Sequence, residues 1–341
     1  MPFRFEVLLL RRQIKIHNIF MHSFTELAAL FEKRFSTTLP FPENPANLYN
    51  PCRYLLALGG KRVRPILCLM ANELFMDISE DAWHAAAGIE LFHNFTLIHD
   101  DIMDKAPVRR GQPTIHERYG LAPGILSGDV MCIYAYQQLA NVKYALPQIL
   151  QLFNKTAIEV CEGQQMDMDF ETRKDVSLAE YLEMITLKTS VLLAAALKIG
   201  ALAGGSLGDN ANKLYCYGKN LGIAFQLQDD YLDAFGDTNA VGKQIGGDIM
   251  ANKKTYLLVK ALENANVEIK EQILGKLQSN SPTKIPDMLA IFTLTGAEAQ
   301  CREAVAHYSK LAFENLNDLA IPSKRKMPLQ ELTEYLLMRD K

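Results

Sequence analysis

Two clusters of aspartates are the residues of this sequence whose type and spacing most directly suggest chemistry. Both follow apolar stretches and share the pattern Asp-Asp-x-x-Asp, at positions 100–104 and 229–233. On a helix, the first and last acids of such a cluster face the same side, and the middle acid is turned aside by about 100°. Carboxylates held this close together repel one another unless a cation lies between them. The members are Asp100, Asp101, Asp104, Asp229, Asp230 and Asp233.

The clusters predict a magnesium site that binds a diphosphate. Oxygen-only ligands suit Mg²⁺ bridging to phosphate, whereas zinc would favour cysteine or histidine. A single acidic cluster is commonly just a solvated helix end. Because the pattern occurs twice, we interpret the two clusters as a clamp: if their helices lie across a cavity, several ions between them would grip one diphosphate.

Three basic elements could bind the phosphate groups. The segment Gly59–Pro65 contains Lys61 and Arg64 just before a predicted helix, whose N-terminal amides also favour anions. The pair Arg109-Arg110 offers planar, bidentate recognition of oxyanions. Lys188, next to Thr189, lies inside an apolar segment, where a lone lysine is often only a surface residue with a buried stem.

Other polar residues are weaker candidates. His93 precedes Asp100 by two helical turns and so faces the same side, but a lone histidine is more often part of the core. His99 faces elsewhere, and we give it no role. Gln164 and Asp167 form a third polar turn on a mid-chain helix.

The glycine-rich segment Gly236–Asn252 has two interpretations. It contains Lys243 and Asp248, and Lys253 follows directly. This composition suits a mobile lid over phosphate, and equally an ordinary surface loop.

Helices must position these residues, because apolar residues recur at three and four positions along almost every long segment. A capping box of Ser177 with Glu180 supports one helix start, and four prolines between Pro40 and Pro51 predict a loop. We therefore predict an all-α fold. The predicted helices are Phe24–Phe35, Pro65–Phe75, Asp81–Asp104, Asp129–Val142, Leu146–Asp169, Ser177–Ala203 and Asn210–Phe235, with two more after Ser279.

Composition sets the broad class. With 341 residues and 49% hydrophobic residues, the chain can bury a large core, and a net charge of −3 argues against nucleic acid as a partner. Six scattered cysteines favour a reduced, cytoplasmic protein. The apolar run Val7–Leu10 is too short to span a membrane. We expect residues 1–20 to be an appendage and residues 21–341 to form one helical domain.

In order and spacing, these motifs resemble the trans-isoprenyl diphosphate synthases, also called polyprenyl synthetases, over about residues 21–341. The resemblance implies a bundle of long helices around a central cavity, and a homodimer. It also implies condensation of an allylic diphosphate (dimethylallyl, geranyl or farnesyl) with isopentenyl diphosphate, with three Mg²⁺ ions per site. The segments that carry it are Gly59–Pro65, Asp100–Asp104 with Arg109–Gly111, Gly163–Asp167, Lys188-Thr189, Phe225–Asp233 and Lys243–Lys253.

The resemblance also assigns roles to individual residues. It implies that the metal ligands are Asp100, Asp104 and Asp229, supported by Asp101, Asp230 and Asp233. It implies that the allylic diphosphate is held by Arg109, Lys188, Thr189, Gln226, Lys243 and Lys253. It implies that isopentenyl diphosphate is held by Lys61, Arg64, His93 and Arg110. Metals and cations would stabilise the leaving diphosphate, and an apolar cavity would keep water from the allylic cation.

Product length should depend on what closes the cavity below the first acidic cluster. Phe95 lies five residues before Asp100, with Thr96 and Phe92 beside it. Plain core packing would explain Phe95 equally well. In the family, an aromatic residue at this place resembles the short-chain pattern, which favours a geranylgeranyl over a farnesyl product.

Two alternatives remain open at this point. A class I terpene cyclase also carries an aspartate-rich helix, although it normally has a different second cluster and lacks Gly-Gly-Lys-Arg-x-Arg-Pro. A non-catalytic subunit of a heteromeric synthase would be expected to have degraded acidic clusters, and both clusters here are intact.

Overall fold

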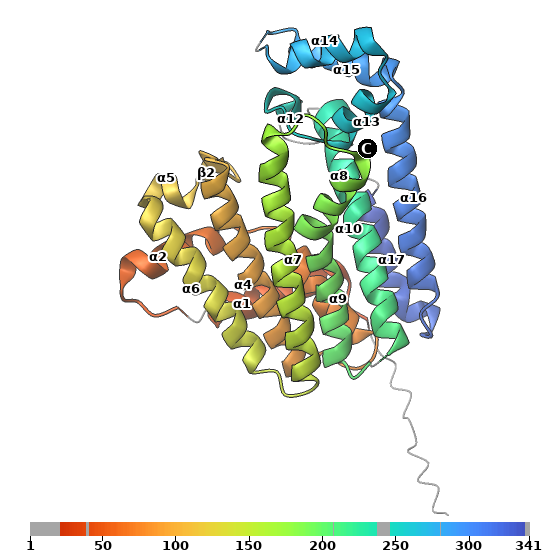
Figure 1. The fold of residues 1–341 in the computed structure, drawn as a ribbon. Coiled ribbons are helices and arrows are strands. Elements are labelled where there is room, and N and C mark those ends of the chain that lie inside the picture. The colour runs from red at the N-terminus through yellow and green to blue at the C-terminus, as the bar shows by residue number, and fades with distance from the viewer. Residues whose placement is uncertain (1–20, 39–40, 207, 237–245, 280, 338–341) are drawn as a thin grey trace, which may run out of the picture.

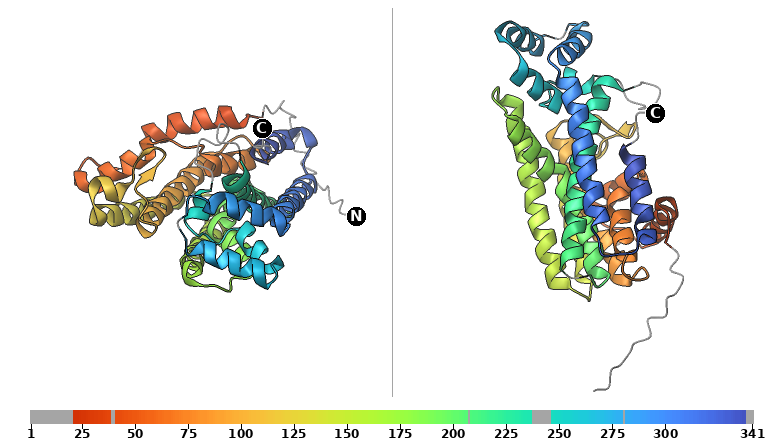
Figure 2. Two further views of the ribbon diagram at one scale, coloured as in Figure 1. Left: turned by 90° about the horizontal axis from the view of Figure 1, so that it is seen from above. Right: turned by 90° about the vertical axis from the view of Figure 1, so that its right-hand side faces the viewer.

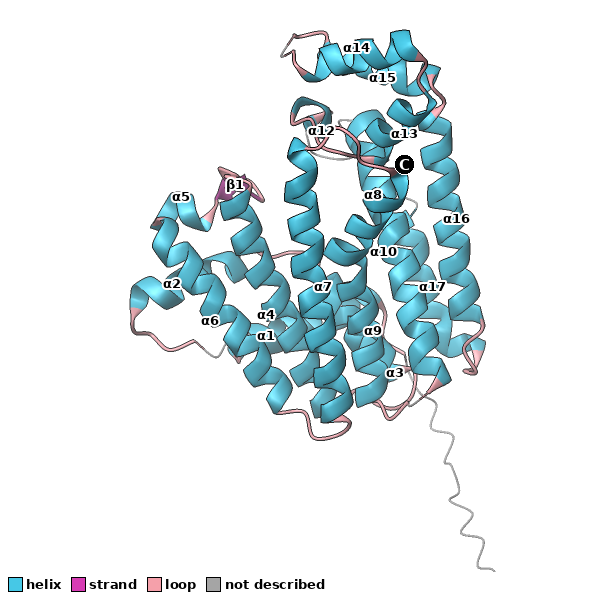
Figure 3. Ribbon diagram, viewed as in Figure 1, coloured by secondary structure: helices cyan, strands magenta, loops and turns pink. Residues whose placement is uncertain are grey.

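Helices form nearly all of the chain in the computed structural model, which describes residues 21–38, 41–206, 208–236, 246–279 and 281–337 (Figures 1 and 3). In these ranges the only strands are β1 (Val108–Arg109) and β2 (Gln112–Pro113), which pair antiparallel. The all-α prediction is therefore confirmed. The predictions for residues 1–20 and for Lys243 lie outside the described residues.

The helices follow one another with short connections, as listed by their bounds. They are α1 (Phe24–Thr37), α2 (Ala46–Ala57), α3 (Val63–Glu73), α4 (Glu80–Met103), α5 (Ile115–Tyr119), α6 (Leu121–Ala140), α7 (Leu146–Thr172), α8 (Leu178–Ile185), the π-helix η1 (Thr186–Ser190), α9 (Val191–Ala203), α10 (Asp209–Phe235), α12 (Gly247–Met250), α13 (Tyr256–Asn264), α14 (Val267–Leu277), α15 (Lys284–Leu294), α16 (Ala297–Asn317) and α17 (Ser323–Leu337). The long helices run side by side, and α14 and α15 extend beyond one end of the bundle (Figure 2).

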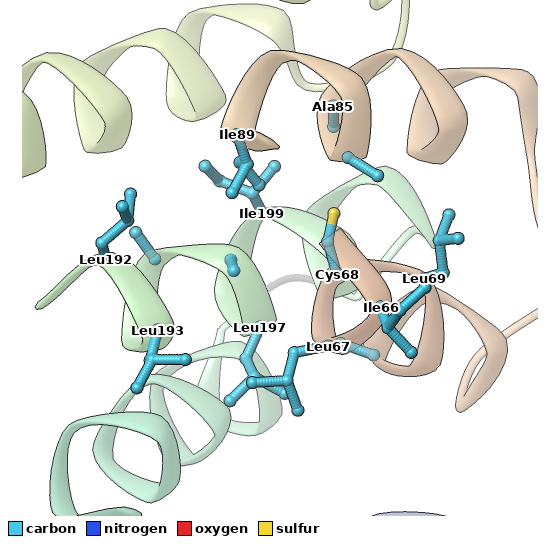
Figure 4. Close-up of a cluster of buried hydrophobic side chains, with 14 of the residues drawn as sticks. Ile66, Leu67, Cys68, Leu69, Ala85, Ile89, Leu192, Leu193, Leu197 and Ile199 are labelled. Carbon is cyan, nitrogen blue, oxygen red and sulfur yellow. The ribbon is translucent and has the colours of Figure 1, made fainter. Parts of the chain in front are cut away.

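Helix α9 is the centre of the bundle because its apolar residues are buried on every side. Two glycines let its neighbours approach closely: a Cβ added to Gly200 would lie 1.9 Å from the carbonyl oxygen of Cys68 on α3. A Cβ added to Gly218 on α10 would lie 2.7 Å from the Cα of Ala194. Leucine and isoleucine side chains of α3, α4 and α9 fill the space between these backbones (Figure 4).

The segment Leu178–Ala203 is long and apolar enough to cross a membrane, with a mean hydropathy of 1.6. However, 72% of its most apolar window is buried inside the protein. Its apolar character is therefore accounted for by its position in the core of the bundle.

The predicted loop from Pro40 to Pro51 is wrong at its end, because α2 begins at Ala46 and contains Pro51. A proline inside a helix removes one hydrogen bond and costs about 3 kcal/mol. Burial of Cys52, Leu55 and Leu56 on the same helix offsets this cost.

Other helix boundaries also differ from the prediction. Helix α6 begins at Leu121 rather than at Asp129, since Pro123 lies in its first turn, where proline is tolerated. The predicted single helix Ser177–Ala203 is divided by η1, although its capping box of Ser177 and Glu180 is present. Three helices rather than two follow Ser279, and α13 and α14 were not predicted.

Candidate active site

A cavity of about 210 Å³ lies between the C-terminal part of α7, the junction of α8 with η1, and the C-terminal half of α10. Its lining combines the third polar turn, the Lys-Thr pair and the second acidic cluster with Asp248 of α12 and three residues that follow this helix. The lining residues are Asp167, Tyr181, Met184, Ile185, Lys188, Thr189, Gln226, Asp230, Asp248, Lys253, Lys254 and Thr255. Segments far apart in the sequence thus form one polar site.

Asp230 of the second acidic cluster lines this cavity from α10, and Asp104 of the first cluster, at the end of α4, acts electrostatically on Lys253 in its lining. Burial lowers the pKa of Lys253, but the carboxylates of Asp248, Asp167, Asp104 and Asp230 together raise it above the ordinary value. Lys253 therefore lies in the field of both clusters. The clamp, in which two groups of carboxylates lie across a cavity from each other, stays a prediction.

Within the first cluster, Asp101 differs from its neighbours because it is already paired. It is 4% exposed, and its two carboxylate oxygens accept hydrogen bonds from Nε and Nη2 of Arg109, each at 2.7 Å. The β1–β2 hairpin turns Arg109 back onto α4 to make this contact. Asp104, by contrast, is exposed at the end of α4.

Asp100 is partly buried, so its exposure is intermediate between those of Asp101 and Asp104. Burial raises the pKa of its carboxyl to about 6, and the positive charge of Lys188 is the largest influence that opposes the shift. Lys188 itself contacts the carboxylate of Asp167 on α7. The lysine therefore connects the mid-chain polar turn with the first acidic cluster.

The second cluster shows the same division between accessible and engaged acids. Asp230 is buried and accepts hydrogen bonds from the Tyr181 hydroxyl, from the Tyr256 backbone N–H at 2.9 Å and from Gln226 Nε2 at 3.2 Å. Asp233 accepts a hydrogen bond from the Asp248 backbone N–H at 2.9 Å. Asp229 is exposed.

Asp100, Asp104 and Asp229, the three predicted metal ligands, are exposed or partly exposed; Asp233 is also partly exposed, but it accepts the hydrogen bond from Asp248. The oxygen-only donor set fits Mg²⁺ by chemistry. Among the described residues, however, no group of three or more Asp, Glu, His or Cys side chains could hold an ion by itself. An ion at this site would therefore need further ligands, such as oxygens of a diphosphate.

The π-helix η1 places Lys188 and Thr189 in the site. A Cβ added to Gly163 on α7 would lie 2.2 Å from the Lys188 backbone nitrogen, so only glycine permits this approach. π-Helical turns inside α-helices occur frequently at functional sites. The apolar pattern of the segment gave no sign of this turn.

A second group of cations lies at the start of α3, opposite the middle of α4. Arg64 Nη1 lies 3.0 Å from His93 Nε2. Burial, followed by the charges of Arg64 and Arg110, lowers the pKa of His93 well below its usual value, so the neutral ring accepts a hydrogen bond from the arginine. Burial also lowers the pKa of Arg64 to about 10.

Arg110 and Lys61 complete this group. A Cβ added to Gly60 would lie 2.9 Å from Nη2 of Arg110, so the glycine makes room for the guanidinium. Lys61 is exposed on the loop between Gly60 and α3. The four residues predicted to hold isopentenyl diphosphate are thus brought to one region.

Aromatic side chains pack against one another along α4, one to two helical turns before the first acidic cluster. Phe95 packs against Phe92 with ring centroids 5.4 Å apart, and Phe92 packs edge-on against Phe153 of α7 at 5.1 Å. Tyr136 of α6 also packs edge-on against Phe153, at 5.1 Å. The hydroxyl of Thr96 donates a hydrogen bond to the His93 carbonyl at 2.8 Å.

Sequence analysis missed two residues of the site. His99, which was given no role, packs edge-on against Phe95 at 4.9 Å, and its spacing of four from Phe95 could have indicated this. Tyr181 contacts Asp230 and lines the cavity. It precedes Lys188 by seven residues, two helical turns, which was the available signal.

The buried carboxyl of Asp230 predicts a pH dependence of stability in the metal-free protein. Burial raises its pKa from about 3.9, the value expected in the unfolded chain, to about 7. Its contribution is therefore fully present below about pH 4 and is lost as the pH rises through about 7. In EDTA, we expect the thermal midpoint to fall by several degrees between pH 5 and pH 8.

Calorimetry of the wild-type protein and of Asp230→Asn would test this expectation. The slope of the midpoint against pH should decrease in Asp230→Asn and stay unchanged in Asp209→Asn, which alters an exposed acid on the same helix. Equal slopes in all three proteins would contradict the assignment.

An all-α bundle with two acidic clusters and a cavity lined by acidic and basic side chains defines the class of isoprenoid synthases. The sequence matches the polyprenyl synthetase family over residues 45–294, and the chain belongs to this family. It is therefore a trans-prenyltransferase of the short-chain type.

Individual relatives cover most of the chain. The geranylgeranyl diphosphate synthase of Methanosarcina mazei is 40% identical over 301 residues, which is 87% of this chain and 91% of that protein. The geranylfarnesyl diphosphate synthase of Natronomonas pharaonis is 34% identical, covering 92% of this chain and 96% of that protein. A crystal structure of a geranylgeranyl pyrophosphate synthase superposes with a TM-score of 0.88 at 42% identity, covering 94% of this chain and all of that one.

Proposed function

We propose that this enzyme condenses allylic diphosphates with isopentenyl diphosphate in a Mg²⁺-dependent reaction that ends at geranylgeranyl diphosphate. The observation that carries this proposal is the difference in burial among the acids: Asp104 and Asp229 are exposed and Asp100 is partly exposed, whereas Asp101 and Asp230 are buried and accept hydrogen bonds from protein donors. The names of the relatives above, which include geranylgeranyl synthases, support the choice of product.

The allylic diphosphate would lie between the two clusters. When bound, three Mg²⁺ ions would neutralise the charge that develops on the leaving diphosphate. Lys188 would exchange its contact with Asp167 for a phosphate oxygen, and Lys253 and Thr189 lie in the same lining. Arg109 is held by Asp101 and would present its remaining N–H groups. We keep Lys243, which lies outside the described residues, in this set.

Isopentenyl diphosphate would bind at the start of α3. Arg64 and Arg110 supply positive charge, and neutral His93 orients the Arg64 guanidinium. The allylic carbon–oxygen bond breaks, the double bond of isopentenyl diphosphate attacks the allylic carbon, and a proton is then lost to the released diphosphate. No side-chain nucleophile is required, and the aromatic residues below the first cluster exclude water.

We also propose that the enzyme acts as a cytoplasmic homodimer and that residues 21–341 form one domain. The six cysteines are free, as expected in a reducing compartment. Large apolar side chains are exposed along α6 and on the neighbouring α7, and burial against a second copy would remove them from water. They are Leu121, Ile125, Leu126 and Ile133 on α6, and Ile158 on α7.

The dimer proposal predicts that Ile133→Glu shifts the protein to a monomer. Ile133 is 66% exposed in the single chain, so a charge there is harmless to the folded chain and unfavourable in a buried interface. Light scattering coupled to size exclusion would measure the mass. Leu294→Glu on α15, at a side chain that is 71% exposed, should leave the mass unchanged. An unchanged mass for Ile133→Glu would place the interface elsewhere.

A direct assay tests the proposed function. The purified protein is incubated with Mg²⁺, isopentenyl diphosphate and each allylic primer in turn, and the products are sized by mass spectrometry. Geranylgeranyl diphosphate should dominate with dimethylallyl, geranyl and farnesyl primers, and EDTA should abolish the reaction. A cyclic hydrocarbon, or no product without an added second protein, would favour a terpene cyclase or a non-catalytic subunit.

A further inference from the structure

Arg62 lies in the middle of the basic segment and yet is buried, with only 5% of its surface exposed. Each nitrogen of its guanidinium has a protein acceptor. Nε donates to Glu32 at 2.9 Å, Nη1 donates to Glu90 at 2.6 Å, and Nη2 donates to the Leu56 carbonyl at 2.9 Å. Arg62 is therefore directed into the protein, whereas the neighbouring Lys61 is exposed to solvent.

The backbone of Arg62 is in the left-handed region, with φ 51° and ψ 31°. This conformation is uncommon for a residue other than glycine and persists where surrounding contacts enforce it. Here it reverses the chain direction at the start of α3, and the Arg62 carbonyl accepts the first helical hydrogen bond, from the Ile66 N–H at 3.1 Å. The turn separates Lys61 from Arg64.

Glu90 connects this turn to the helix that carries the rest of the site. It lies on α4, three residues before His93, and its Oε1 also accepts a hydrogen bond from Asn94 Nδ2 at 2.8 Å. The pair Arg62–Glu90 thus fixes the basic segment against the part of α4 where Arg64 meets His93. Burying two charges is costly, so such a pair is better explained by the geometry that it imposes than by added stability.

We propose that Arg62 is a positioning residue for isopentenyl diphosphate: through Glu90, Glu32 and the Leu56 carbonyl it holds Lys61 and Arg64 at the distance from His93 and Arg110 that the diphosphate requires. Arg62 does not touch the substrate. The inference rests on the proposed function, because it presumes that these four residues bind isopentenyl diphosphate.

Arg62→Lys tests the proposal, because lysine keeps the charge and loses the planar fork that reaches three acceptors. We expect the KM for isopentenyl diphosphate to rise about tenfold or more, with the KM for the allylic primer and kcat within about twofold of wild type. Glu90→Gln should shift the same KM in the same direction. Arg34→Lys is the control for the substitution itself, since Arg34 forms a two-hydrogen-bond pair with Glu80 that is exposed and outside the site, and its KM values should not change.

Arg62→Gly distinguishes the role of the side chain from that of the backbone turn, because glycine removes the guanidinium but adopts the left-handed conformation without strain. We expect its KM for isopentenyl diphosphate to rise as well, and a wild-type value would overturn the proposal. Circular dichroism monitors folding of every variant. If Arg62→Lys does not fold, Glu32→Gln tests the proposal instead, because Glu32 is the half-exposed partner of Arg62. A raised KM for isopentenyl diphosphate in Glu32→Gln supports the proposal, and an unchanged KM overturns it.

Arg64→Met distinguishes failure of the inference from failure of the proposed site. If Arg64→Met raises the KM for isopentenyl diphosphate while Arg62→Lys and Glu90→Gln leave it unchanged, the positioning role of Arg62 is wrong and the site stands. If Arg64→Met also leaves this KM unchanged, the proposed isopentenyl diphosphate site is wrong, and the inference fails with it.

Discussion

Replacing either Asp100 or Asp229 by asparagine is expected to lower kcat by roughly two to three orders of magnitude, the size of effect seen when one preorganised charge-stabilising group is removed. The two residues stand on α4 and α10, the helices that carry the two acidic clusters, and neither is buried and hydrogen-bonded as Asp101 and Asp230 are. Asparagine keeps the shape of the side chain and removes the charge that an Mg²⁺ ion needs.

Steady-state kinetics at saturating Mg²⁺ would measure this effect, with circular dichroism to show that the helices persist. Asp209→Asn on α10 is the matched control, because Asp209 is exposed in the first turn, where it pairs with Lys213, and its kcat should equal that of wild type. Near-normal turnover in both Asp100→Asn and Asp229→Asn would contradict the clamp.

Asp233→Asn should behave differently from Asp229→Asn, although the sequence motif treats the two residues alike. The carboxylate of Asp233 accepts the Asp248 N–H, and its backbone carbonyl accepts the Gly246 N–H at 2.7 Å. It therefore connects the end of α10 to the start of α12. An asparagine oxygen can still accept the Asp248 N–H, so the loss of charge should matter less here.

The acidic clusters can be read from the sequence alone because their spacing is local. Spacing of four on a helix places Asp100 and Asp104 on one side, whatever the rest of the chain does. Which acids remain accessible depends on distant partners instead. Asp101 is engaged by Arg109 from a hairpin, and Asp230 by Tyr181 from another helix, and neither contact follows from the local pattern.

The predicted helix boundaries were wrong for a related reason. Pro51 lies inside α2 because tertiary burial of the same helix outweighs its local preference, and η1 interrupts a continuous apolar pattern because α7 approaches through Gly163. The buried network of Arg62 is a third case. In the sequence, Arg62 is one more cation in a basic motif. Only its contact with Glu90 on α4 shows that the side chain faces inward.

Replacing Phe95 by alanine is expected to lengthen the product by one or more isoprene units. Phe95 stands one helical turn below the first cluster and packs against Phe92 and His99, so removing its ring opens the cavity along α4. A growing chain that meets Phe95 after four units in the wild type would then continue toward Phe92 and Phe153. Mass spectrometry of the products made from farnesyl diphosphate would measure the shift.

Phe75→Ala is the control, because Phe75 is also a partly buried phenylalanine packed on the same core, at the end of α3. It should lower stability and leave product length unchanged, which separates an opened cavity from a loosened core. Since Phe153 lies behind Phe92 in the same aromatic contact series, the double variant Phe95→Ala, Phe153→Ala should make longer products than Phe95→Ala alone. If Phe95→Ala gives the wild-type product and Phe153→Ala gives a longer one, the floor lies on α7 rather than on α4.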